Sequence, residues 1–355
     1  MSILIDHEVV PRDRKLTHST FNTSVVAKSE QYDIWQTSIS CIFETATPQA
    51  FKEDGFNACI SSTWFNCMLF ARTRCPGQTW VRTKLKAATD GLDHLMFQFY
   101  VTGEHTWQKK GDYLVLPRRG ILVFDLSQEV TSITTHAETI VLIIPKLLLS
   151  QYIDISHNYH MKIFYPDSSL TLALYDHVLT LDRLRTDLSV SEAQLLLPAT
   201  LSLVSACINS TLNWDNPAQL TALKSTFKHR LTDLIDRNLS NHNLSTLLVS
   251  GQMGMSRATL YRFLEDCGGV ESFIRKRRLD HAAKLLSDPR NIRQKIYDIA
   301  NEVGYKTEAG FCKAFKRQFG ITPSDARNSY ADIEQKNINI EGALDRSYEE
   351  WIRSM

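Results

Sequence analysis

The sequence has no apolar run long enough to cross a lipid bilayer. The longest, Thr139–Ser150, is interrupted by Pro145 and Lys146, whereas a transmembrane helix needs about 20 predominantly apolar residues. The start, Met1–Glu8, lacks the basic and apolar regions of a secretory signal. We therefore expect a soluble cytoplasmic protein without a membrane partner.

Paired cysteines are also missing. The seven cysteines are an odd number and none belongs to a C-x-x-C pair, so neither a structural zinc, a redox dithiol nor a disulfide framework is indicated. We expect reduced thiols, no metal and no cofactor. A zinc-dependent DNA-repair alkyltransferase stays open as a second hypothesis, although Cys59, Cys67 and Cys75, each eight residues apart, lack the close spacing it needs.

Charge is distributed unevenly along the chain. The net charge of the 355 residues is only +1, but residues 220–330 carry 19 Lys and Arg against 11 Asp and Glu, a net of +8. Residues 331–355 have a net charge of −3 and residues 1–219 one of −4. A basic block beside acidic ones indicates that residues 220–330 contact a polyanion such as double-stranded DNA.

The first 165 residues have the pattern of a β-rich domain. Ile34–Phe43, Leu95–Val101 and Gly120–Asp125 are rich in β-branched and aromatic residues and are separated by turn residues, as in an antiparallel sandwich or small barrel. We expect a cupin-like antiparallel β-barrel with flanking helices. No acid–base or nucleophile constellation occurs in it, so an enzyme is not expected.

Helical periodicity begins after Pro145. Apolar residues recur from Leu170 to Leu181 and again from Ala193 to Cys207, and the second helix is apolar enough to need cover on more than one side. The cover is either the barrel or a second copy of the chain. We therefore assign residues 166–213 to a helical segment that is a candidate dimer interface, and residues 214–219, which include Pro217, to a linker.

The basic block contains an internal repeat. Ser250, Gly254, Ser256, Leu260 and Leu264 in one copy correspond to Ala300, Gly304, Thr307, Phe311 and Phe315 in the other. A small residue, a glycine able to adopt positive φ, a capping hydroxyl and apolar residues four apart are the elements of a helix-turn-helix. The sequence therefore predicts two such units within residues 220–330, followed by an acidic tail, residues 331–355.

An amphipathic helix, Phe273–Leu286, separates the two units and would act as a rigid strut. Within its run Arg275–Arg278, we expect Arg277 to pair inside the domain and the other cations to lie at a solvated or phosphate-facing surface. If both units contact one face of DNA, their second helices should lie about 34 Å apart, one duplex turn.

This stretch resembles the AraC/XylS family of transcriptional regulators over about residues 244–327. The resemblance rests on a long ordered pattern, and residues 120–145 more loosely resemble the sensing domain of the subgroup that includes regulators of aromatic-amine and benzoate catabolism. Three features depart from the family pattern, namely Val249–Ser250, Gly310 and a short loop at Cys267–Gly269. The matching residues are Gly254–Ser256, Leu260–Arg262, Arg277–Leu279, Ala282, Leu285–Leu286, Ile299–Ala300, Gly304–Tyr305, Phe311, Phe315–Arg317, Phe319–Gly320, Thr322–Pro323 and Arg327.

The resemblance implies a site for each unit. Arg262 has the chemistry to bond bidentately to guanine, with a phosphate contact or an internal ion pair as its alternatives, and Glu308 is equally explained by the helix dipole. The implied base-reading residues are Ala258, Tyr261 and Arg262 in the first unit and Glu308, Ala309 and Lys313 in the second. The expected phosphate-contacting residues are Ser256, Arg257, Arg275, Thr307, Lys316 and Arg317.

The resemblance further implies a cytoplasmic, ligand-responsive regulator, usually an activator, that joins the nucleoid when bound to DNA. Its expected partners are RNA polymerase, a small-molecule effector such as an aromatic compound, and a second copy of the chain. Trp35, Trp64, Trp80 and Trp107 are weak candidates for lining the effector pocket, because barrel cores contain such residues in any case.

Overall fold

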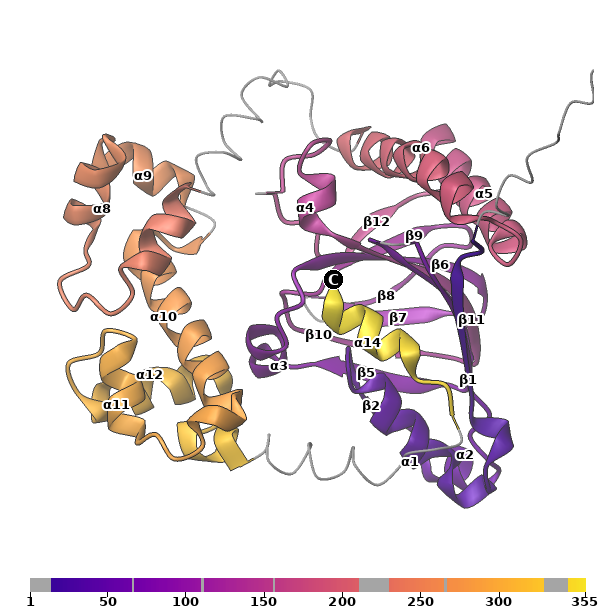
Figure 1. Ribbon diagram of the computed structural model, residues 1–355, viewed down its shortest axis with the longest axis horizontal. Coiled ribbons are helices and arrows are strands. Elements are labelled where there is room, and N and C mark those ends of the chain that lie inside the picture. The colour runs from indigo at the N-terminus through magenta and orange to yellow at the C-terminus, as the bar shows by residue number, and fades with distance from the viewer. Residues whose placement is uncertain are drawn as a thin grey trace, which may run out of the picture.

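The computed structural model consists of an N-terminal domain built on two sheets and a C-terminal helical domain beside it (Figure 1). The expected linker, residues 214–219, lies outside the described part of the chain. The structure describes residues 14–65, 67–109, 112–155, 157–210, 230–264, 267–328 and 344–355.

Both sheets of the N-terminal domain are antiparallel. The larger has the order β1 (Thr17–Asn22), β3 (Cys59–Trp64), β4 (Leu69–Cys75), β11 (Ala137–Pro145), β6 (His94–Thr102), β9 (Ile121–Asp125) and β12 (Lys162–Phe164). The smaller has the order β2 (Glu44–Ala46), β5 (Gln78–Arg82), β10 (Val130–Thr134), β7 (His105–Lys109) and β8 (Asp112–Val115).

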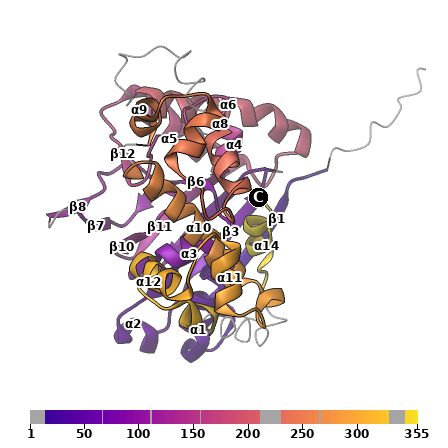
Figure 2. The same ribbon diagram turned by 90° about the vertical axis from the view of Figure 1, so that its left-hand side faces the viewer.

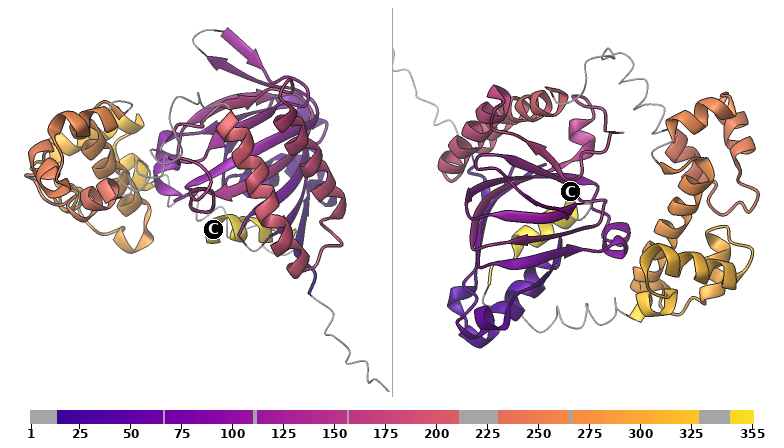
Figure 3. Two further views of the ribbon diagram at one scale, coloured as in Figure 1. Left: turned by 90° about the horizontal axis from the view of Figure 1, so that it is seen from above. Right: turned by 180° about the vertical axis from the view of Figure 1, so that it is seen from behind.

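The seven-stranded sheet is the middle of three layers, because both of its faces are buried. Along β6, Leu95, Phe97 and Phe99 pack against one outer layer, whereas Met96 and Tyr100 pack toward the smaller sheet. This two-residue alternation follows from the geometry of a strand. The first outer layer is the helix pair α5 (Ser169–Leu184) and α6 (Val190–Ser210), which lie side by side across the sheet (Figure 3).

The expected antiparallel domain with flanking helices is confirmed, with its strands in two sheets rather than one closed barrel. The prediction of a strand at Ile34–Phe43 is wrong, because this segment lies mostly in helix α1 (Lys28–Ile39). Tyr32, Trp35 and Ile39 are its buried large residues, and their spacing of three and four is that of a helix face. The remaining helical segments of the domain are η1 (Thr23–Val25), α2 (Gln49–Glu53), α3 (Lys84–Thr89) and α4 (Lys146–Leu149).

Helix α6 is the one described helix that is long and apolar enough to cross a membrane by length and composition. Its Leu201, Val204 and Ile208 are buried in the core that α5 and the larger sheet share. This is the arrangement of a core helix. Its outer face is different, because Leu195 is 80% exposed there.

The C-terminal domain is a series of helices with two apolar cores. One core is built around Leu231, Leu260 and Ile274, and the other around Leu279, Ala300 and Phe311. Residues 230–237 and 323–328 are also helical. The named elements are α8 (Thr246–Met253), α9 (Arg257–Phe263), α10 (Val270–Ser287), η3 (Pro289–Asn291), α11 (Ile296–Glu302) and α12 (Glu308–Phe319).

The described end of the acidic tail returns to the N-terminal domain. Helix α14 (Ser347–Ser354) packs against β3 and β4, within the N-terminal domain (Figure 1). Tyr348 and Ile352, one helical turn apart, are buried in the core between the two sheets. The tail is therefore part of the N-terminal domain's core, an arrangement the sequence analysis did not anticipate.

Candidate nucleic-acid interface

The first helix-turn-helix unit comprises α8 and α9. Gly254 ends α8 in the left-handed conformation, with φ of 65°, which glycine adopts without steric cost. Ser256 then caps α9 by accepting a hydrogen bond from the backbone N–H of Thr259 at 3.2 Å. The Ser250 hydroxyl donates to the Leu247 carbonyl within α8, which explains how a serine is accommodated at this buried position.

The second unit comprises α11 and α12. Gly304 has φ of 80°, and a Cβ there would lie 2.2 Å from the Leu239 carbonyl oxygen, so this position requires glycine for space as well as for conformation. Thr307 caps α12 by accepting from the N–H of Gly310 at 3.2 Å. Gly310, which departs from the family pattern, lies in the exposed first turn of α12.

Four apolar residues anchor α9 and α12 to the cores. Leu260, Leu264, Phe311 and Phe315 are each at most 1% exposed, as the i, i+4 spacing predicts. The opposite faces of α9 and α12 are therefore left to solvent. The two units lie toward opposite ends of α10, which joins them as the expected strut (Figure 2).

All six residues assigned to base reading are exposed. Tyr261 is 49% exposed, and its ring lies against Gly269, where an added Cβ would be 3.0 Å from the ring. One edge of the ring therefore faces Gly269. Ala258 and Arg262 of α9, and Glu308, Ala309 and Lys313 of α12, are exposed as well.

The six residues assigned to phosphate contact are exposed too. Two of them already use their side-chain oxygens in hydrogen bonds within the domain. Ser256 and Thr307 serve as helix caps, so the backbone N–H groups of these first turns are the donors best placed for a phosphate. The remaining four are Arg257, Arg275, Lys316 and Arg317.

The basic run on α10 is divided between the surface and the interior. Arg277 pairs with Asp236, with Nε 2.8 Å from Oδ1, which confirms the expected internal pair. The prediction for Arg278 is wrong, since its guanidinium donates to the backbone carbonyls of Leu239 and Asn241 and burial lowers its pKa. Carbonyls that follow a helix lack helical partners and accept such donors.

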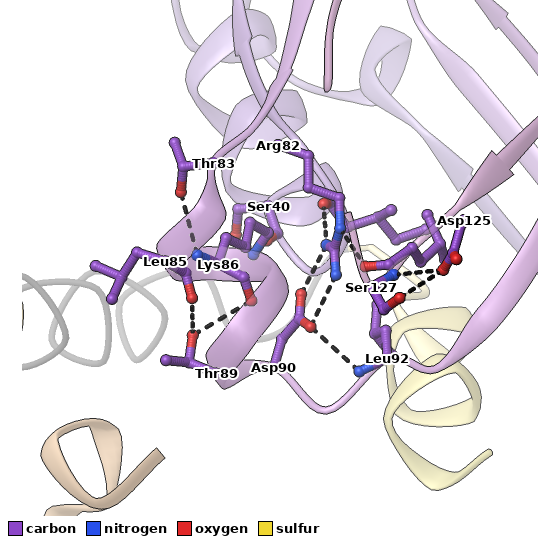
Figure 4. Close-up of polar contacts among 12 residues, drawn as sticks. Ser40, Arg82, Thr83, Leu85, Lys86, Thr89, Asp90, Leu92, Asp125 and Ser127 are labelled. Carbon is purple, nitrogen blue, oxygen red and sulfur yellow. Dashed lines mark hydrogen bonds and ion pairs between the residues drawn. The ribbon is translucent and has the colours of Figure 1, made fainter. Parts of the chain in front are cut away.

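The helical domain contacts the N-terminal domain through α3. Leu85 and Ala88 of α3 pack against the core around α10 and α12. Arg82, just before α3, is fully buried and binds Asp90, just after it, with distances of 2.7 and 2.9 Å (Figure 4). This pair joins both ends of α3 and fixes the surface on which the helical domain rests.

A cavity of about 60 Å³ lies between the two sheets of the N-terminal domain. Most of its walls are apolar, and Gln98, Tyr100 and Thr139 supply polar groups. Nearby, His105 is buried against Tyr100, whose hydroxyl lies 2.5 Å from Nδ1, and burial lowers the His105 pKa to about 3. Within the described residues, no charged side chain lines this cavity.

The four candidate tryptophans occupy different places. Trp80 lines the cavity and donates to Thr134. Trp35 is buried behind it and donates to Gln78, and Trp64 stacks on Trp351 of the tail helix at 6.2 Å between centroids. Trp107 is buried beside His105. The structure brings only Trp80 of these four to the cavity wall.

Two contributors to this architecture were missed from the sequence, α3 and α14. For α14 a signal existed, because Tyr348, Trp351 and Ile352 have helical spacing within an otherwise polar segment. For α3 the short segment gives no comparable signal. Among the described residues, no group of three or more His, Cys, Asp or Glu could hold a metal ion, and nothing there favours the alkyltransferase hypothesis.

Comparison with known proteins assigns the helical domain. A family model described as a helix-turn-helix domain matches residues 249–329. PqrA of Proteus vulgaris, named as a probable transcription factor, is 32% identical over 91 residues, which are 25% of this chain and 72% of that protein. VirF of Yersinia enterocolitica, a virulence regulon transcriptional activator, is 33% identical over 78 residues, 21% of this chain and 28% of that protein.

A solved structure extends the similarity in fold beyond the helical domain. The AraC-like transcriptional activator CuxR aligns with a TM-score of 0.51 at 19% identity, covering 75% of this chain and 95% of its own. Of three other curated relatives, this chain spans only 8%, 25% and 31% of the length. Because the structure contains two helix-turn-helix units and the chain covers 72% of PqrA, the chain belongs to the AraC/XylS family of DNA-binding transcriptional regulators.

Proposed function

We propose that this protein is a sequence-specific transcriptional activator that responds to a small molecule bound in its N-terminal domain. The observation that carries the DNA-binding part is the pair of capped helices, α9 and α12, whose core-facing sides are anchored and whose other sides are exposed. The cavity between the sheets supports the effector part. Activation would proceed through contact with RNA polymerase, and VirF is a relative named as an activator.

The first test is footprinting on the DNA beside the protein's own gene at several salt concentrations. Wild type should protect two adjacent major-groove segments per monomer, and the protection should weaken as salt rises. Arg262→Ala should cost about 1–3 kcal/mol, roughly 5- to 150-fold in affinity, because a bidentate contact to a base is lost.

Arg290→Ala is the matched control. Arg290 belongs to the same domain and lies in η3, outside both recognition helices, where it pairs with the capping residue Asp288. Its replacement should leave the affinity for specific DNA unchanged within about twofold. Equal, weak binding to every DNA sequence that Arg262→Ala does not alter would contradict the proposal.

Dimerisation is proposed through the outer face of α6. Leu195 is 80% exposed there, and an apolar side chain of that size contributes about 1.5–3 kcal/mol when it is buried. Leu195→Asp should therefore weaken self-association at least roughly tenfold, as measured by sedimentation velocity. Leu147→Asp, at a 74% exposed leucine on α4, should leave self-association intact; equal effects of the two changes would refute an α6 interface.

A further inference from the structure

The tail helix α14 forms part of the wall of the small cavity between the sheets. Its volume is about 60 Å³, and Tyr348 and Ile352 of α14 form part of its wall. Pockets for drug-sized ligands typically measure about 300–1,000 Å³. An effector of that size therefore fits only if part of the wall withdraws, and Tyr348 and Ile352 are the part that α14 contributes.

Helix α14 is seated by specific contacts as well as by apolar burial. Tyr348 and Ile352 are 2% and 1% exposed, and the Tyr348 hydroxyl lies 2.7 Å from Ser38 Oγ on α1. Ser38 also donates to the Glu349 carboxylate, and Asp345 accepts from the N–H of Thr20 at 3.1 Å. Trp351 stacks on Trp64. Helix α14 is thus fixed in the cavity wall by hydrogen bonds, ring stacking and apolar contacts together.

Helix α14 depends on these contacts with the N-terminal domain for its helical structure. It has only eight residues, and an isolated helix of that length is unstable in water. Release from the cavity should therefore unfold the helix, which leaves two discrete states, a seated helix and a released segment.

Helix α14 is also linked to the helical domain. The chain passes from that domain into the tail. Arg353 of α14 lines a cleft of about 520 Å³ together with Leu85 of α3, Phe319 at the end of α12 and Ile321 beyond it. Helix α14 therefore borders the same cleft as the helical domain, which itself packs on α3.

We propose that α14 is an internal plug of the effector cavity, which a neutral, largely apolar ligand displaces, and that its displacement removes one restraint on the DNA-binding domain. Neutrality follows from the cavity wall, where no charged side chain occurs among the described residues, because an ion buried there would have no counter-charge. Gln98, Tyr100 and Thr139 suit one hydrogen-bonding group on the ligand. The link to DNA rests on the function proposed above, whereas the competition for the cavity does not.

The first test uses wild-type full-length protein and N-phenyl-1-naphthylamine, a neutral apolar fluorophore. At saturating probe, amide hydrogen exchange in residues 347–354 should become at least tenfold faster, while exchange in residues 169–184 of α5 should not. Unchanged or slower exchange in residues 347–354 would overturn the proposal, since the probe would then bind without displacing α14.

The second test compares variants by fluorescence titration with the same probe. Tyr348→Ala and Ile352→Ala should each bind the probe at least tenfold more tightly than wild type, because the plug no longer competes. Glu350→Ala, at an exposed position of the same helix, should match wild type within twofold. If either cavity variant retains its circular dichroism spectrum and binds no more tightly than Glu350→Ala, the plug does not exist. The exchange experiment decides the question if both variants unfold.

A DNA-binding assay separates this inference from the proposed function. Tyr348→Ala should bind specific DNA at least threefold more tightly than wild type without probe, and addition of probe should raise wild-type affinity by a similar factor. Unchanged DNA affinity alongside successful probe tests would overturn the restraint on the DNA-binding domain. A complete lack of specific DNA binding in every variant, with the probe tests successful, would refute the proposed function and leave the plug standing.

Discussion

Gly304→Ala is expected to destabilise the second helix-turn-helix unit by roughly 2–5 kcal/mol, which combines left-handed backbone strain with forced overpacking. The added Cβ would lie 2.2 Å from the Leu239 carbonyl oxygen and 2.7 Å from Arg278. The carbonyl belongs to the backbone and cannot rotate away. Arg278 in turn binds the Leu239 and Asn241 carbonyls, so relief of the clash would break those hydrogen bonds.

Gly254→Ala is the matched control for this prediction. Gly254 holds the equivalent turn position and also has positive φ, but an added Cβ there meets nothing within 4 Å. The cost should be only about 1–2 kcal/mol of left-handed strain. Amide exchange of α9 and α12 in the full-length variants measures both effects locally, and equal costs at the two glycines would show that the close approach at Gly304 is not limiting.

Arg82→Ala is expected to destabilise the N-terminal domain by about 3–5 kcal/mol, the usual cost of removing one partner of a buried ion pair. The change leaves Asp90 without its ion-pair partner. It also leaves the Ile42 and Leu126 carbonyls, to which Arg82 donates at 2.8 and 2.7 Å, without their donors. Because Arg82 and Asp90 hold the two ends of α3, the support for the DNA-binding domain should loosen as well. Thermal unfolding followed by tryptophan fluorescence would measure the effect.

Arg74→Ala provides the comparison for Arg82. Arg74 also pairs with a carboxylate, Glu138, at 2.7 Å, but its side chain is 62% exposed, and exposed pairs contribute about 0–1 kcal/mol. A loss at Arg74 as large as that at Arg82 would contradict the view that burial makes the Arg82–Asp90 pair important.

The helix-turn-helix units could be predicted from the sequence because their determinants are local. Gly254, Ser256 and Leu260 each act within one turn of the chain, through φ, a cap and a helical anchor. Gly304, Thr307 and Phe311 give the same local signals, although the close approach of the Leu239 carbonyl to Gly304 is a contact between distant segments. Short-range geometry of this kind is fixed by residue type and spacing. Which of the exposed side chains read bases stays a prediction.

The parts that were missed depend on distant segments. Alternation over Ile34–Phe43 resembled a strand, yet Trp35 and Ile39 are buried on one helix face, and tertiary packing decides between such readings. Arg278 was assigned to the surface because its acceptors, the carbonyls near Leu239, lie about 40 residues away. The seat of α14 in the first domain is a contact across some 300 residues, from Ser38 to Tyr348, which no local pattern encodes.

The position of α14 also determines the order in which the molecule can be completed during synthesis. Ribosomes add about 5–20 residues per second, and domains generally fold in order from the N-terminus. Tyr348 and Ile352, which complete the core between the sheets, are synthesised only after residues 230–328, about 10–40 s after Phe164 at those rates. Helix α14 can therefore reach its place in the cavity wall only after the DNA-binding domain has been synthesised.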